Sequence, residues 1–246
     1  MTHTVEARDV RKGYPDATGR RTEIIRGVSL DVAPGEMVSI VGPSGSGKST
    51  LLYGLSGLEP ADAGTVTIDG VDIGALSPTR LARFRREKVG FVFQSYNLIP
   101  ALTVRENVTL PLRLARGRVV ESEVQAALAA VGIAELAHQR PGALSGGQQQ
   151  RVAIARVLAT SPRVVFADEP TGALDTVTGS VVLDLLRESA RGDRSVVMVT
   201  HDLDAAARAD RVLVLQDGLI REELRDPDPR IVFDAVARAS AWRTGQ

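Results

Sequence analysis

The chain has 246 residues, of which 43% are hydrophobic and 24% are charged, so the composition predicts a globular protein rather than a disordered one. Its 30 Lys and Arg residues balance 30 Asp and Glu residues, so net charge indicates neither a nucleic acid nor an acidic membrane as partner. Cysteine is absent, which excludes a disulfide scaffold, a Cys-ligated zinc site and a thiol nucleophile. No apolar run is long enough to span a bilayer, and the polar N-terminus does not resemble a signal peptide.

Apolar runs predict strands in the first hundred residues, at 22–32, 37–41, 64–68, 71–73 and 89–93. Pro34-Gly35 and Asp69-Gly70 predict turns. The strand at 37–41 leads directly into glycines, and a helix from Lys48 to about Ser56 is expected after them. We interpret a basic run as the solvated face of a further helix, formed by Arg80, Arg83, Arg85, Arg86 and Lys88.

Between about residues 95 and 160 the pattern becomes helical, with helices expected at 104–115, 121–131 and 147–159. Strands return at 163–167, 195–199 and 211–215, separated by helices at 176–190 and 203–208. Alternating strands and helices are typical of a mainly parallel sheet. The helical stretch interrupts this alternation and therefore indicates a subdomain inserted into the sheet. Asp217-Gly218 predicts a terminal hairpin. The end of the chain predicts a short helix with spaced apolar residues, namely Ile231, Val232, Phe233, Val236 and Trp242.

A glycine-rich stretch directly after the strand at 37–41 matches the phosphate-binding pattern G-x-x-x-x-G-K-[ST]. Its members are Gly42, Pro43, Ser44, Gly45, Ser46, Gly47, Lys48, Ser49 and Thr50. In such a loop the backbone N–H groups surround phosphates, the lysine neutralises the β- and γ-oxygens, and the hydroxyl can bind Mg²⁺. The strand before the loop and the helix after it favour this interpretation over a purely structural turn.

Two adjacent acids, Asp168 and Glu169, follow the buried strand at 163–167. In P-loop folds such a strand places its first carboxylate near Mg²⁺. The second carboxylate can then orient or deprotonate the attacking water. Strand and acids alone would also suit a surface turn, but beside a P-loop they predict a site for nucleotide hydrolysis.

Three single residues have both a structural and a functional interpretation. His201 follows the strand at 195–199, where α/β sheets bind ligands, so it is either merely exposed or a donor to a γ-phosphate. Gln94 follows the strand at 89–93 and is either an ordinary loop residue or a ligand of Mg²⁺ and water. Tyr14 is either a core aromatic or a platform for a base.

A second candidate anion site lies at residues 144–151, which read LSGGQQQR. Ser145 and Gln148 have the S-x-x-Q spacing of a capping box, so a helix start is expected here. Free N–H groups at a helix start attract anions, yet this stretch contains no lysine. The local pattern alone does not explain why one chain would carry two anion sites.

Together these residues resemble the ATP-binding subunits of ABC transporters over essentially residues 3–224. P-loops occur in many ATPases and GTPases, whereas LSGGQ at 144–148 is the discriminating motif. The order of the motifs also matches that family, since LSGGQ is followed by the acid pair, then by Ala173-Leu174-Asp175 and then by His201.

The resemblance implies a role for each matched residue. It assigns ATP binding to Tyr14, Gln94 and the loop at 42–50, in which Lys48 holds the phosphates. It assigns Mg²⁺ to Ser49, Gln94 and Asp168, general-base catalysis to Glu169 and γ-phosphate sensing to His201. Ser145, Gly146, Gly147 and Gln148 would face the ATP held by a second copy, and Asp175 would link the two sites across that dimer.

The expected fold is therefore α/β, with a P-loop NTPase core of the RecA-like type, an antiparallel β-subdomain near the N-terminus and a helical subdomain inserted at about 95–160. The ATPase domain is expected over residues 1–224, with a short extension at 225–246. The expected function is ATP hydrolysis, with ATP and Mg²⁺ as cofactors and a head-to-tail second copy. Such a chain would be cytoplasmic and held at the inner face of the membrane by a separate permease, which it would contact just after Gln94.

Finer similarity at residues 91–100 and 167–172 points to the branch that serves lipoprotein release, macrolide or peptide export and the related cell-division complex, although that branch commonly has Asn in place of Ala173. Two other functions stay open. Soluble relatives that act on ribosomes or DNA usually fuse two ATPase domains or carry long coiled coils, and neither is visible here. A regulatory complex of the cell-division type would use the same motifs without transport.

Overall fold

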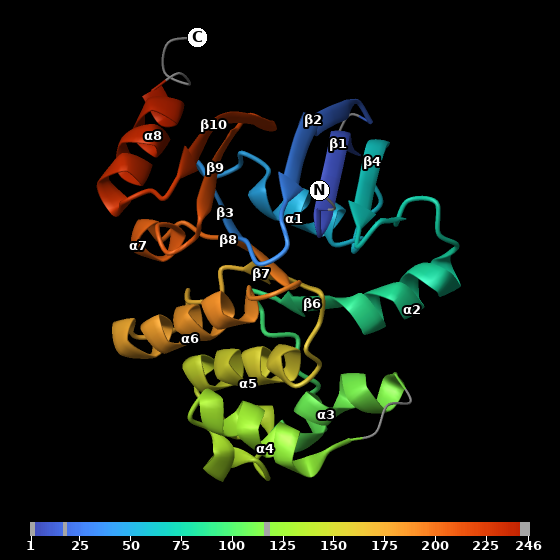
Figure 1. Ribbon diagram of the computed structural model, residues 1–246, viewed down its shortest axis with the longest axis vertical. Coiled ribbons are helices and arrows are strands. Elements are labelled where there is room, and N and C mark those ends of the chain that lie inside the picture. Colours follow the sequence, from blue (N-terminus) through green and yellow to red (C-terminus); the bar gives the residue numbers. More distant parts are fainter. Residues whose placement is uncertain (1–2, 17–18, 116–118, 242–246) are drawn as a thin grey trace.

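The computed structural model describes residues 3–16, 19–115 and 119–241, which form two sheets with helices packed around them (Figure 1). The smaller sheet is antiparallel and has the order β2-β1-β4-β5. Its strands are β1 (Val5–Pro15), β2 (Arg21–Val32), β4 (Ala63–Ile68) and β5 (Val71–Asp72). Asp69 and Gly70 both have positive φ, 51° and 77°, as a two-residue hairpin turn of this kind requires.

The larger sheet has the order β10-β9-β3-β8-β7-β6 and is parallel except for the edge strand β10. Its strands are β3 (Met37–Val41), β6 (Val89–Val92), β7 (Val164–Asp168), β8 (Ser195–Val199), β9 (Arg211–Gln216) and β10 (Leu219–Arg225). Strands β3, β7 and β8 are buried along their whole length, which explains their continuous apolar runs. The predicted α/β fold with an antiparallel and a mainly parallel sheet is confirmed.

Helices cover the two faces of the parallel sheet. On one face, α1 (Lys48–Leu55) packs against β1, β2, β7 and β8 and buries Leu51, Leu52 and Leu55. The other face is covered by α5 (Gly146–Leu158), which packs against β6, α3 (Val104–Leu114), α4 (Glu121–Ala130) and α6 (Thr176–Ser189). Short 3₁₀ turns at Ala134–Leu136 and Pro141–Ala143 complete this helical part, which lies at the bottom of Figure 1.

Two helices lie at the periphery of the molecule. The basic run forms α2 (Pro78–Lys88), which has no buried residue, so the expected solvated helix is present. The terminal helix α8 (Pro229–Ala241) buries Val232, Ala235 and Ala239 near β9 and α7 (Leu203–Ala206). Ile231 and Phe233 are exposed, whereas Trp242 lies outside the described residues.

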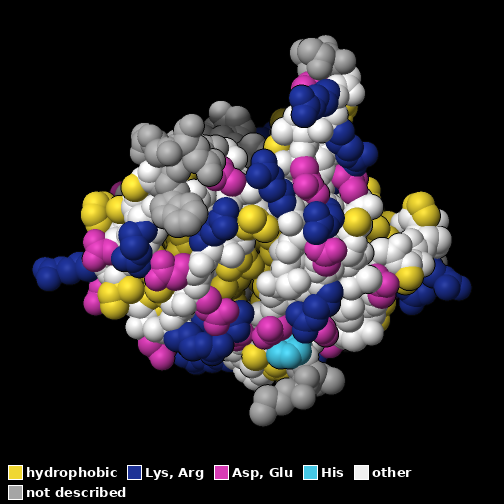
Figure 2. Space-filling view, turned by 90° about the horizontal axis from the view of Figure 1, so that it is seen from above, with side chains coloured by type: hydrophobic (Ala, Val, Ile, Leu, Met, Phe, Trp, Pro, Cys, Tyr) yellow, Lys and Arg dark blue, Asp and Glu magenta, His cyan; other side chains and the backbone are white. Residues whose placement is uncertain are grey.

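Within the described ranges, no helix is both long and apolar enough to cross a membrane. The face seen from above carries basic and acidic side chains in alternation rather than a field of one sign (Figure 2).

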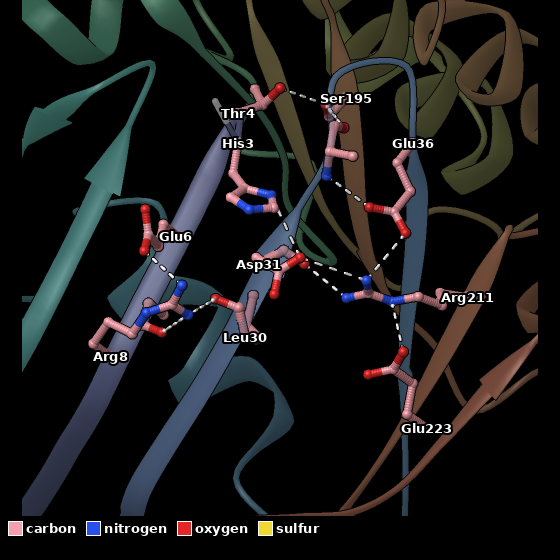
Figure 3. A network of polar contacts seen from close by, with 12 residues as sticks. His3, Thr4, Glu6, Arg8, Leu30, Asp31, Glu36, Ser195, Arg211 and Glu223 are labelled. Atoms are coloured by element: carbon pink, nitrogen blue, oxygen red, sulfur yellow. Dashed lines mark hydrogen bonds and ion pairs between the residues drawn. The ribbon is translucent and has the colours of Figure 1, made fainter. Parts of the chain in front are cut away.

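A buried guanidinium joins the two sheets (Figure 3). Arg211, at the start of β9, has a side chain only 6% exposed and lies 3.7 Å from Asp31, 3.4 Å from Glu36 and 3.5 Å from Glu223. It also donates to the backbone oxygen of Asp31 at 2.7 Å. Because Asp31 belongs to β2 and Glu223 to β10, this one side chain holds the antiparallel sheet against the larger sheet.

Candidate functional site

The glycine-rich loop leaves β3 at the centre of the parallel sheet and enters α1. Gly42 has φ of 151°, and a Cβ there would collide with the backbone oxygen of Leu215. Gly47 has φ of 100°, and its Cβ would lie 2.8 Å from Ile25. Both positions therefore require glycine. No side chain caps α1 at Gly47, so the first N–H groups of the helix stay available for an anion.

Lys48 turns back over this loop in the structure. Its Nζ donates to the backbone oxygens of Gly42 at 3.0 Å and Pro43 at 3.1 Å. Burial lowers the pKa of Lys48, while the negative charges of Glu169 and Asp168 oppose that shift. The ammonium thus lies between the loop and the two acids, where a phosphate group could replace the two carbonyl acceptors.

Asp168 lies at the end of β7 and is only 1% exposed. The Ser49 hydroxyl donates to its Oδ1 at 3.1 Å, and the Tyr53 hydroxyl donates to its Oδ2 at 3.1 Å. Burial raises the pKa of Asp168, and these two donors partly offset the effect. Burial and the neighbouring Asp168 raise the pKa of Tyr53 to about 12, so its phenol remains a hydrogen-bond donor at neutral pH.

Glu169 has a side chain 11% exposed and a backbone in the left-handed region, with φ of 51°. Strand β8 lies between β3 and β7, and the turn after it supplies two hydrogen-bond donors and one imidazole nitrogen to this carboxylate. Thr200 Oγ1 and the His201 backbone N–H each lie 3.3 Å from Oε2, and His201 Nδ1 lies 2.9 Å from Oε1. The strand order therefore brings the residues after β3, β7 and β8 to one edge of the sheet.

The oxygen donors at this edge fit Mg²⁺. Ser49 Oγ and Asp168 Oδ1 lie 3.1 Å apart, and Mg²⁺ is commonly held by one or two carboxylates together with substrate phosphates. In the described part of the chain, no cluster of three or more His, Cys, Asp or Glu side chains could hold a metal by itself. The donor set therefore fits a metal that arrives with phosphate oxygens rather than a closed protein cage.

The LSGGQ stretch forms the expected helix start. Ser145 is the N-cap of α5: its hydroxyl accepts from the Gln148 N–H at 3.3 Å, and Gln148 Oε1 accepts from the Ser145 N–H at 2.8 Å. A Cβ at Gly147 would lie 3.2 Å from the backbone oxygen of Ala173. Because α5 packs on the face of the sheet opposite α1, this helix start does not join the phosphate loop of its own chain.

The remaining predicted site residues, Asp175, Tyr14 and Gln94, have other surroundings in the structure. Asp175 caps α6 by accepting from the N–H groups of Val177 at 3.1 Å and Thr178 at 3.0 Å. Tyr14 is 38% exposed at the end of β1, and its hydroxyl donates to Glu59. Gln94 is exposed in the turn that follows β6. Their predicted roles toward a nucleotide or a second copy stay predictions.

Two residues of this edge were missed from the sequence. Tyr53 lies four residues after Ser49, so both side chains project from one face of α1, and that spacing is a signal that could have found it. Thr200 precedes His201 and shares its position after β8. Neither belongs to a motif with its own pattern, because each acts through an acid that is distant in the sequence.

Comparison with known proteins identifies the family. Residues 25–172 match the family model described as "ABC transporter". The chain is 46% identical over 222 residues to an uncharacterized ABC transporter ATP-binding protein of Thermotoga maritima, covering 89% of this chain and 94% of that protein. A solved ATP-binding cassette, a dimer in a post-hydrolysis state with ADP and Pi bound, superposes with a TM-score of 0.86 and 40% identity, covering 91% of this chain and 99% of that one.

Longer relatives also match. The macrolide export ATP-binding/permease protein MacB of Neisseria meningitidis serogroup B is 42% identical over 97% of the chain, and the pyoverdine export ATP-binding/permease protein PvdT of Pseudomonas putida is 45% identical over 89%. The chain spans only 37% and 34% of the lengths of these two proteins. The family model and the full-length relative together cover the phosphate loop, the LSGGQ helix and the acid pair. This chain therefore belongs to the ABC transporter family, as an ATP-binding domain.

Proposed function

We propose that this chain binds ATP with Mg²⁺, hydrolyses the γ-phosphate bond and drives a separate membrane permease in export. The proposal rests on two contacts at one edge of the sheet. Ser49 Oγ lies 3.1 Å from Asp168 Oδ1, and His201 Nδ1 lies 2.9 Å from Glu169 Oε1. The solved dimer with ADP and Pi and the macrolide and pyoverdine export relatives support it.

Nucleotide binding rests on the loop at 42–50 and on Lys48. The loop amides and the uncapped start of α1 hold the phosphates, and Lys48 exchanges its two backbone acceptors for phosphate oxygens. Tyr14, which already has Lys12 Nζ 5.3 Å from its ring centroid, stacks on adenine. Ser49, Asp168 and Gln94 would hold Mg²⁺, which would supply positive charge to the phosphates.

Hydrolysis uses Glu169 as the general base. Thr200 and His201 fix its carboxylate, so it can accept the proton of a water that attacks the γ-phosphate in line. His201 is 75% exposed, and it donates to the γ-phosphate once substrate is present. Positioning and charge stabilisation supply most of the rate enhancement, as in other phosphoryl transfers.

The LSGGQ helix serves the ATP site of a second copy. Ser145, Gly146, Gly147 and the helix start at Gln148 need no lysine of their own, because Lys48 of the other copy already holds the phosphates. Asp175, at the start of α6, links the two sites. ATP binding closes this head-to-tail dimer, and hydrolysis with product release reopens it.

The permease docks beside the segment that follows Gln94. A groove opens there between α2, β6, α3 and α5, with an apolar floor that includes Phe91, Phe93 and Leu110. Arg156 of α5 donates to the backbone oxygens of Tyr96 at 3.0 Å and Asn97 at 2.7 Å. Movement at this segment therefore reaches the helix that begins with LSGGQ. In this arrangement residues 1–224 form the ATPase domain, residues 225–246 an extension, and the chain lies at the cytoplasmic face of the membrane.

The test is reconstitution with a four-span permease that has a large extracytoplasmic domain. Co-purification with that permease and ATP-dependent movement of its substrate in proteoliposomes support the proposal. ATP turnover without substrate movement favours a regulatory complex, and co-purification with ribosomes instead contradicts the permease. Leu114→Asp, at the groove, is expected to weaken co-purification, whereas Ile231→Asp on the exposed face of α8 serves as the matched control.

A further inference from the structure

We propose that Tyr53 is a positioning residue that sets the metal selectivity of this site: its hydroxyl occupies one oxygen of Asp168, so that the other oxygen alone is presented to the metal, which favours Mg²⁺ over Ca²⁺. The inference rests on the function proposed above, because it concerns the metal that accompanies ATP. It adds a residue that belongs to neither the phosphate loop motif nor the acid pair.

The two oxygens of Asp168 have different partners. Oδ1 accepts from Ser49 Oγ at 3.1 Å, and Oδ2 accepts from the Tyr53 hydroxyl at 3.1 Å. Both donors project from one face of α1, four residues apart. Asp168 is 1% exposed, so water does not compete freely for Oδ2. The carboxylate is therefore oriented with Oδ1 toward the serine that is expected to share the metal.

Contacts of both the ring and the backbone of Tyr53 hold its hydroxyl in place. Its ring lies 5.7 Å from that of Phe91 at an interplanar angle of 52°. Its backbone oxygen accepts from the N–H groups of Leu58 at 3.0 Å and Glu59 at 3.2 Å and from Ser56 Oγ at 3.1 Å. A side chain anchored in this way cannot follow a rotating carboxylate, so rotation of Asp168 would cost the Oδ2 hydrogen bond.

The aromatic contact also continues toward the segment that would contact the permease. The ring of Phe91 lies 4.2 Å from that of Phe93, which directly precedes Gln94. The rings of Tyr53, Phe91 and Phe93 therefore form a packed row that ends at the residue before Gln94.

The chemistry of the two cations explains the selectivity. Mg²⁺ demands near-octahedral geometry and takes single carboxylate oxygens, whereas Ca²⁺ accepts six to eight oxygens and often both oxygens of one carboxylate. An Asp168 whose Oδ2 is engaged offers one oxygen only. Hydrogen-bond partners of ligating carboxylates typically change metal affinity by about 10- to 100-fold, so the loss of one phenol hydroxyl is expected to lie near the lower end of that range.

The experiment compares the full chain with Tyr53→Phe, which keeps the ring and removes the hydroxyl. Mn²⁺ binding in the presence of a non-hydrolysable imido analogue of ATP is followed by electron paramagnetic resonance, and Mg²⁺ and Ca²⁺ are measured by competition. We expect Tyr53→Phe to weaken Mn²⁺ and Mg²⁺ about tenfold while Ca²⁺ affinity is retained or rises. Thr109→Val, which removes a buried hydroxyl bonded to Glu106 in α3, is the matched control and should leave all three affinities unchanged.

Two outcomes would overturn the inference while leaving the proposed function intact. One is a Tyr53→Phe chain with unchanged affinities for all three metals. The other is an equal loss for Mg²⁺ and Ca²⁺ together with a lower melting temperature of the metal-free chain, which would mean a merely structural hydroxyl. A wild-type chain that binds no Mn²⁺ with the ATP analogue would instead refute the proposed function, and this inference with it.

Discussion

His201 Nδ1 lies 2.9 Å from Glu169 Oε1, although the two residues are 32 positions apart in the chain. The contact exists because β7 and β8 are adjacent parallel strands and both residues follow their carboxyl ends. The Thr200 hydroxyl and the His201 backbone N–H each donate to the other oxygen of the same carboxylate at 3.3 Å. A carboxylate fixed in this way is ready to orient water, and this arrangement leads to the first prediction.

Glu169→Gln should retain nucleotide binding and lose turnover. The amide keeps the size of the side chain but cannot accept a proton, so the ATPase rate should fall by at least about 100-fold. Nucleotide affinity is measured by calorimetry and the dimer by light scattering, where the variant with ATP should accumulate as a closed dimer. Wild-type turnover by this variant would rule out the general-base role.

Lys48→Ala should weaken ATP binding by about 10- to 100-fold, the value of one or two charge-assisted hydrogen bonds to phosphate. Equilibrium binding of a fluorescent ATP analogue measures the change. Lys88→Ala, which removes an ammonium that pairs instead with Asp69 at 3.0 Å, is the control. Equal affinities for Lys48→Ala and wild type would refute the phosphate-loop interpretation.

Shared sites predict complementation between two inactive chains. Ser145→Arg should block the LSGGQ helix, and Lys48→Ala should block the phosphate loop, so each variant alone is inactive. In a head-to-tail heterodimer one site is intact, so an equal mixture should recover about a quarter of the wild-type rate. The rate of the wild type should also rise faster than linearly with protein concentration. A mixture as inactive as its components would count against sharing.

Arg211→Met should destabilise the fold by about 3 kcal/mol, because it leaves carboxylates without their buried cation. This value lies at the lower end of the destabilisation usually caused by breaking a buried ion pair, because Asp31 and Glu223 are themselves partly exposed. The free energy of unfolding is measured with urea. Arg238→Met, which removes a surface pair with Glu222, should cost less than about 1 kcal/mol. Equal effects of the two substitutions would contradict the assigned network.

Acid should destabilise the wild type more than Asp69→Asn. The Lys88 ammonium, and then the Arg163 guanidinium, hold the pKa of Asp69 below its usual value of 3.8. A depressed folded pKa stabilises the protein above the unfolded pKa, and that stabilisation is lost as the pH falls through the folded value. Unfolding free energies measured from about pH 5 down to about pH 2 should therefore fall less steeply for Asp69→Asn. Parallel curves would show that this carboxylate does not contribute.

Local patterns in the sequence determined the elements and the motifs. The apolar runs of β3, β7 and β8, the helix after Lys48 and the capping box of Ser145 each depend on residues within one turn or one strand. The family resemblance follows from the same local motifs, because their order in the chain can be read without knowing which strands are neighbours.

Only the tertiary structure decided which of these residues meet. The order β9-β3-β8-β7-β6 places Ser49 against Asp168 and His201 against Glu169, and it leaves the LSGGQ helix on the opposite face of the sheet. The roles of Tyr53 and Arg211 likewise depend on distant partners. Tyr53 donates to Asp168 and Arg211 donates to Asp31, and each pair is more than a hundred residues apart in the chain. Strand order and contacts between distant residues are set by how whole faces pack, and no short stretch of sequence encodes that packing.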